Sequence, residues 1–255
     1  QGRADAQYNL AVAYRAGDGV AKDDAQAVEW LRKAAEGGHT PARYNLALLR
    51  EDNGAPVEPV IPAYLSLAEE GHTDAQVRVM HYYAEKQQDE RAVYWAQQAA
   101  KNHHPQAQIF LARHYQHSKV PNLPAAHRLY QQAAAQGIVS AHWQLANQFL
   151  HGQGVPKNHK QALYHLRIAA DADVAQAELG KLLLEGRYLP ADVEEGMKWI
   201  NKAVRQEDDA ACAFIAKQYL TGEHIGRDYK KAALYAAKAA TGLRPPGAHL
   251  LRVTG

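Results

Sequence analysis

The chain has 255 residues and a mass of 28.2 kDa, and its 47% hydrophobic and 22% charged residues are typical of a globular protein, which excludes a disordered one. No stretch approaches the ~18 consecutive apolar residues of a transmembrane helix, and the single cysteine, Cys212, excludes an internal disulfide and a cysteine zinc site. The net charge of +2 is far from the basic balance of nucleic-acid binders, so we expect no nucleic-acid partner.

An alanine begins the same short pattern seven times, at intervals of 32–36 residues. The alanines are Ala6, Ala42, Ala75, Ala107, Ala141, Ala175 and Ala211. An aliphatic residue follows each of them four positions later, and in six copies a large apolar residue follows eight positions later. Offsets of four and eight mark one face of an α-helix, so each unit begins with a helix.

A second helix is predicted in every unit from spacings of three and seven. The clearest copies are Ala27, Trp30, Ala34, then Ala92, Trp95, Ala99, then Gly196, Trp199, Ala203, and Ala232, Tyr235, Ala239. The alanines allow helices to approach closely and the aromatic residue fills the space between them. Each unit is therefore a helix, a turn and a second helix.

Taken in chain order, the units begin near residues 4, 40, 73, 105, 139, 173 and 209, and residues 245–255 are expected to start a further repeat or a cap. Glycines close the first helix at 17–20, 152–155 and 222–226. In the second unit, prolines in 51–59 and Pro62 predict an extended, projecting connection in place of helix. In the fourth unit, 117–124 is a second irregular loop. Each of these loops reflects either sequence drift in a loop that is free of packing constraint or a contact with a partner.

These residues carry a family resemblance. The pattern Ala-x-x-x-Leu-Ala-x-x-Tyr-x-x-Gly-x-Gly-Val, followed by Ala-x-x-Trp-x-x-x-Ala-Ala, resembles the Sel-1-like repeat, a relative of the tetratricopeptide repeat. Residues 4–39 match it best, 139–172 and 209–242 match well, and 40–138 hold three degenerate copies. The resemblance implies an all-α protein, a right-handed α-solenoid of about seven stacked helix-turn-helix repeats. We expect one domain over 1–255.

Charge is unevenly distributed along the chain. Residues 101–170 contain seven basic residues and no Asp or Glu, together with nine of the fourteen histidines. The basic residues are Lys101, Arg113, Lys119, Arg128, Lys157, Lys160 and Arg167. We interpret them as a basic patch for a partner with an acidic surface, or as an accident of composition. The patch is expected to strengthen as the pH falls through roughly 6.5 and the histidines become charged.

The chain shows no catalytic motif, so we expect a non-enzymatic protein without a cofactor. It lacks His-Glu-x-x-His, Gly-x-Ser-x-Gly and the phosphate-binding glycine loops. His114 and His117 have the spacing of a metal-binding pair but no further ligand nearby in sequence, so no metal is expected. Cys212 is predicted to be a small core residue.

The resemblance to tetratricopeptide-like solenoids implies that first helices line a concave groove. Positions two, six and nine after each repeat alanine would face that groove. The predicted contacts with a partner are Tyr8, Tyr44, His81, Arg113, Trp143, Lys181 and Lys217. At the ninth position, Leu150, Leu184 and Leu220 are expected to pack against neighbouring helices instead.

The leading hypothesis is a scaffold or adaptor that holds a protein or peptide in this groove, in a bacterial envelope, motility or secretion context. The alternative, also implied by the resemblance, is a cognate inhibitor, an immunity protein that blocks a secreted phospholipase effector one-to-one. We expect a monomer or weak self-association. Because the chain begins at Gln1 rather than Met, we expect a fragment or a processed protein. The compartment stays open, with the periplasm slightly favoured over the cytoplasm.

Overall fold

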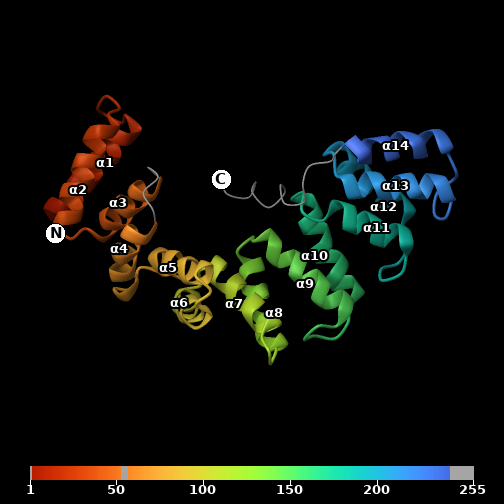
Figure 1. Cartoon of the computed structure of the whole chain (residues 1–255), viewed down its shortest axis with the longest axis horizontal. Coiled ribbons are helices and arrows are strands. Elements are labelled where there is room, and N and C mark those ends of the chain that lie inside the picture. The colour runs from red at the N-terminus through yellow and green to blue at the C-terminus, as the bar shows by residue number, and fades with distance from the viewer. Residues whose placement is uncertain (1, 53–56, 242–255) are drawn as a thin grey trace. The chain divides into compact units, whose positions relative to one another are not determined.

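The computed structural model describes residues 2–52 and 57–241, which form fourteen helices and no strand (Figure 1). The helices are α1 (Gly2–Ala16), α2 (Asp24–Glu36), α3 (Thr40–Asp52), α4 (Val57–Glu69), α5 (Thr73–Glu85), α6 (Asp89–Lys101), α7 (Pro105–His117), α8 (Leu123–Ala135), α9 (Val139–His151), α10 (His159–Asp171), α11 (Gln176–Glu185), α12 (Val193–Arg205), α13 (Asp209–Thr221) and α14 (Tyr229–Thr241). The expected repeat or cap at 245–255 lies outside the described residues.

The chain forms two compact units, residues 1–119 and 120–255. Unit 1 contains α1 to α7 and unit 2 contains α8 to α14, and within each unit every helix packs against the next one along the chain. The predicted all-α solenoid of helix pairs is confirmed. The prediction that 1–255 behaves as one domain stays a prediction.

The repeat alanines lie at the contacts between successive helix pairs. Six of the seven that open a first helix are buried, from Ala42 to Ala211, and so are the closing alanines of six second helices, from Ala34 to Ala203. Ala6 is exposed because no described helix precedes α1, and Ala239 in α14 is partly exposed. A methyl side chain at these contacts lets neighbouring helices approach closely, as the sequence predicts.

In four repeats, a side-chain cap and a backbone hydrogen bond close the turn between the first and the second helix. Asp23 accepts hydrogen bonds from the amides of Ala25 and Gln26, both at 3.0 Å, and so caps α2. The amide of Asp23 also donates to the carbonyl of Tyr14 at 3.0 Å. The same bond recurs from Asn158 to Phe149, from Asp192 to Leu183 and from Asp228 to Tyr219. This bond fixes where the second helix starts relative to the end of the first.

The prediction of an extended connection through Pro62 is wrong, because α4 already begins at Val57 and contains both Pro59 and Pro62. Pro59 lies in the first turn, where backbone amides have no acceptor within the helix, so it costs little. Pro62 removes one helical hydrogen bond. The burial of Ile61, Tyr64 and Leu67 offsets that loss. Residues 53–56 lie outside the described residues.

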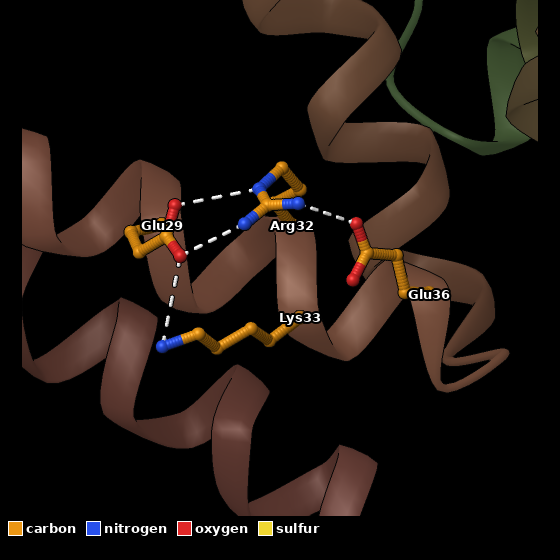
Figure 2. A network of polar contacts seen from close by, with 4 residues as sticks. All are labelled: Glu29, Arg32, Lys33 and Glu36. Carbon is orange, nitrogen blue, oxygen red and sulfur yellow. Dashed lines mark hydrogen bonds and ion pairs between the residues drawn. The ribbon is translucent and has the colours of Figure 1, made fainter.

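The exposed face of α2 carries local ion pairs. On α2, Arg32 lies between Glu29 and Glu36, with nitrogen–oxygen distances of 2.9 and 2.6 Å, and Lys33 lies 3.6 Å from Glu29 (Figure 2). Such pairs, three or four residues apart on a helix, stabilise it only weakly, because both partners are exposed to solvent. They keep this face of α2 soluble while the opposite face is buried.

The links between repeats contain residues with positive φ, and substitutions there test the effect of this backbone conformation on stability. Gly137 joins α8 to α9 with φ of 81°, and Glu207 joins α12 to α13 with φ of 59°. A Cβ at Gly137 would meet nothing within 4 Å, so a substitution there changes stability through the backbone conformation and not through a steric clash. We expect Gly137→Ala to lower the free energy of unfolding by about 1 kcal/mol, and Glu207→Gly to raise it by about 0.5 kcal/mol. Urea unfolding checks both variants, and shifts of the same sign would contradict this account.

Candidate functional site

A cleft of about 550 Å³ opens in unit 1 between α1, α2 and α3. Its lining combines an apolar floor with a polar rim and consists of Tyr8, Ala11, Val12, Arg15, Lys22, Asp24, Ala27, Val28, Leu31, Asn45 and Leu49. We call it the α1–α3 cleft. Its volume lies in the range of sites that hold a small ligand or a few side chains.

The α1–α3 cleft brings together the three groove positions predicted for the first repeat, Tyr8, Val12 and Arg15. Val12 on α1 and Val28 on α2 both line the cleft, and their exposed fractions are 48% and 41%. The floor therefore offers apolar surface to a partner. Arg15 is exposed on the rim and forms no ion pair with another described residue. The cleft can therefore take an apolar side chain and, beside it, an acidic group.

Polar contacts fix the position of the cleft wall. The Asn45 side-chain amide on α3 donates to the Tyr8 hydroxyl at 3.2 Å. The Tyr8 ring stacks on His39 with centroids 4.4 Å apart, and His39 Nδ1 accepts the amide of Ala42 at 3.2 Å. Because Nδ1 is the acceptor, the proton of neutral His39 is on Nε2, which lies 3.5 Å from an oxygen of Asp5. Tyr8 thus joins two repeats as well as lining the cleft.

Tyr44 joins the second repeat to the third as Tyr8 joins the first to the second. Its ring stacks on His72 at 4.6 Å, and burial raises the pKa of its hydroxyl. Beside it, the Tyr64 hydroxyl donates to Glu51 at 2.9 Å, and Arg78 lies 3.3 Å from the other oxygen of Glu51. Burial, followed by the hydrogen bond to Glu51, raises the pKa of Tyr64. These polar contacts join α3 to α4 and to α5 within unit 1.

The remaining predicted partner contacts do not gather at this cleft. His81 and Arg113 are exposed on α5 and α7 of unit 1. In unit 2, Trp143 is half-buried against the core, and Lys217 is exposed. Lys181 lies 5.8 Å from the centre of the Phe214 ring. Their contact with a partner stays a prediction.

The ninth-position leucines differ from one another. Leu150 and Leu184 are buried, as predicted. The prediction for Leu220 is wrong, because 55% of its surface is exposed. In the described chain, α13 and α14 are the last helix pair, so no following pair covers Leu220 as one covers its two counterparts.

All seven residues of the basic patch are exposed, but one is neutralised. Arg167 donates to both oxygens of Glu195, at 2.9 and 2.6 Å, and Glu195 lies on α12, outside the carboxylate-free stretch. This bond holds the pKa of Glu195 below its usual range. Arg167 is the one patch residue that forms an ion pair with a described residue. The sequence count missed the pairing because Glu195 is 28 positions away.

Three histidines of the same stretch form a cluster in unit 2. The Nδ1 atoms of His142 and His165 lie 2.8 Å apart, and His127 is buried with its Nδ1 2.7 Å from the side-chain oxygen of Gln148. Burial, reinforced by the charges that His142 and His127 would carry, lowers the pKa of His165 to about 4, and burial lowers the pKa of His142. The expectation that the histidines charge as the pH passes 6.5 is therefore wrong for these two.

The described part of the chain shows neither a metal-binding cluster nor an exposed cysteine. No three His, Cys, Asp or Glu side chains gather there as a metal would require, around His114 and His117 or elsewhere. Cys212 is buried, as predicted, and burial raises the pKa of its thiol. No helix among residues 2–52 and 57–241 combines the length and apolar character needed to cross a bilayer.

Several residues that line the cleft, and two buried glutamines elsewhere in the repeats, could not be found from the offsets two, six and nine. Val28 and Leu31 belong to a second helix, and Asn45 and Leu49 lie at offsets three and seven on α3. Gln76 and Gln176, directly after repeat alanines, are buried and donate to the carbonyls of Ala68 and Ala170, both at 3.1 Å. The recurrence of glutamine after the repeat alanine is the one signal that could have revealed these bonds.

The histidine cluster predicts a pH dependence. Unfolded histidine has a pKa near 6.5, whereas folded His165 has a pKa of about 4, so below pH 6.5 the unfolded chain binds a proton that the folded chain does not. Stability is thus complete above pH 6.5 and falls as the pH drops toward 4. We expect a loss of about 1 kcal/mol by pH 5 from this residue, after allowing for solvent screening.

Urea unfolding at pH 7.5 and pH 5 measures this effect. The non-titrating variant His165→Phe should show a smaller difference between the two pH values than the unsubstituted chain. The control His159→Gln changes an exposed histidine and should leave the difference unaltered. An unchanged difference in His165→Phe would contradict the assignment.

Comparisons with known proteins agree with this architecture. A model of the Sel1 repeat matches residues 4–39, 75–104, 105–138, 139–174, 173–208 and 209–242. An uncharacterized protein of Neisseria meningitidis serogroup B is 40% identical over 98% of this chain and 53% of its own length.

Two solved structures share the fold. A protective antigen of uropathogenic Escherichia coli with an SLR fold has a TM-score of 0.83 and 24% identity, over 96% of this chain and 55% of its own. A Sel1 repeat protein of Oxalobacter formigenes has a TM-score of 0.69 and 25% identity, over 97% of this chain and 75% of its own. The chain thus spans about half the length of the Neisseria and Escherichia coli proteins.

Proposed function

The chain belongs to the Sel1 repeat family, and from this we propose that it is a non-enzymatic scaffold that binds a partner protein through the α1–α3 cleft. Members of this family are typically scaffolds for protein interaction. The observation that carries the proposal is the cleft of about 550 Å³ in which Tyr8, Val12 and Arg15 meet two exposed or partly exposed residues of the neighbouring helices, Val28 and Leu49.

The chemistry of the cleft defines the partner segment. Exposed valines over a floor of alanine and leucine favour an aliphatic or aromatic anchor, because burying such a side chain contributes about 1.5–3 kcal/mol. Arg15 favours an acidic group beside that anchor, and the patch residues of unit 1, Lys101, Arg113 and Lys119, which form no ion pair with a described residue, favour a partner with an acidic surface. A bacterial envelope or secretion setting is part of the proposal, and the 40% identical Neisseria protein supports a bacterial origin.

Substitution of the two exposed valines tests the proposal. The double variant Val12→Lys, Val28→Lys places charge on the floor of the cleft, at positions exposed enough to leave the fold intact. We expect a partner retained from a lysate of the source organism to be lost by this variant, since a lysine there removes apolar contact and adds a desolvation cost. Affinity capture with mass spectrometry measures the loss.

The matched control is Val174→Lys, Val193→Lys, which changes two valines of unit 2 with similar exposed fractions, 49% and 44%. It should retain the partner. Loss of the partner in both double variants, or in neither, would contradict recognition at the cleft. A retained partner that is an enzyme and loses its activity in a one-to-one complex would identify an inhibitor, the alternative from the sequence, instead of a scaffold.

A further inference from the structure

A second cleft, of about 430 Å³, lies between α4, α5 and α6 of unit 1, apart from every predicted groove position. It is lined by Leu65, Glu69, Tyr83, Glu90, Arg91, Tyr94 and Trp95. We call it the α4–α6 cleft. Its walls are aromatic and its rim is acidic, a combination that the α1–α3 cleft does not share.

Of the three aromatic side chains in the cleft, Tyr94 is the most exposed to solvent. Tyr94 has 53% of its surface exposed and rests with its edge against Trp95, their centroids 5.1 Å apart. Trp95 is almost fully buried, so it holds Tyr94 in place from beneath. Tyr83 on α5 forms the facing wall, and the Arg91 guanidinium lies 5.3 Å from its ring centre. This contact shows that a ring of this cleft accepts a cation within the usual distance for a cation–π interaction.

The rim carries negative charge that the described chain does not neutralise. Glu69 and Glu90 are exposed, and neither forms an ion pair with any described residue. Some other carboxylates of unit 1 are paired, as Glu70 is with Arg43 at 2.7 Å, Glu58 with Lys86 at 2.7 Å, and Glu29 with Arg32 (Figure 2). With Arg91 included, the formal charge of the cleft is −1.

We propose that the α4–α6 cleft binds a basic segment of a partner protein, with an Arg or Lys side chain lying on Tyr94 between Glu69 and Glu90. The ring face attracts the cation, and the two carboxylates pair with it and with its neighbours. Residues 1–100 contain fifteen acidic and ten basic residues, so this part of the chain carries a net negative charge. Charge complementarity therefore favours a basic occupant. The inference concerns a second surface and does not depend on recognition at the α1–α3 cleft.

A fluorescein-labelled hexa-arginine peptide tests the proposal by fluorescence anisotropy. We expect saturable binding that weakens about tenfold in the double variant Tyr94→Ala, Glu90→Gln, which removes one ring face and one carboxylate. Tyr94→Phe keeps the ring and should bind within about twofold of the unsubstituted chain. Circular dichroism confirms that each variant is folded.

The matched control is Tyr164→Ala, Glu194→Gln, which makes the same change in composition and charge at exposed positions of unit 2. It should bind the peptide as the unsubstituted chain does. Equal weakening in both double variants would overturn the proposal, because the peptide would then respond to overall charge alone. The absence of saturable binding would also overturn it.

Sedimentation velocity of the chain alone addresses a different occupant. A dimer that dissociates in Tyr94→Ala, Glu90→Gln would overturn the assignment to a partner protein, since the basic stretch 101–170 of a second copy would then occupy the cleft. A monomer in both forms agrees with the proposal.

Discussion

The structure depends on one constraint: a pair of thirteen-residue helices cannot bury its apolar face by itself and must stack on another pair. Alanine at the contact points allows this stacking, because a methyl group lets neighbouring helices approach closely. Ala42, Ala75 and Ala107 are buried for this reason, whereas Ala6, which has no described pair before it, is exposed. The period of the sequence follows directly from this contact.

Some residues that stack the repeats on one another also lie at the surface of the molecule. Tyr8 and Tyr44 stack on His39 and His72 at the start of the next repeat, so their rings contribute to stacking and also lie on the surface open to a partner. The α1–α3 cleft lies where the two helices of the first repeat meet α3 of the second, and Val12 and Val28 are its exposed apolar residues. Because the stacking already fixes the position of these side chains, the entropic cost of the proposed binding would be lowered.

The sequence predicts the helix pairs and their stacking because those depend on alanines and aromatics at regular spacing. It does not predict which side chains meet across different helices. The pairing of Arg167 with Glu195, the lowered pKa of His165 beside His142, and the contribution of Val28 to the cleft each join residues from different helices. The error at Pro62 has another cause: propensity alone predicts a break, but buried Tyr64 and Leu67 hold the helix. Three of the eleven residues that line the candidate site were therefore predicted from the sequence as groove positions, namely Tyr8, Val12 and Arg15.

Site-specific photo-cross-linking tests most directly whether partners bind at the α1–α3 cleft. A photoreactive phenylalanine analogue at position 28, in the cleft, and at position 174, equally exposed in unit 2, is irradiated in a lysate of the source organism. Our account predicts a defined adduct from position 28 and none from position 174. An adduct from position 174 alone, or from neither position, would contradict it.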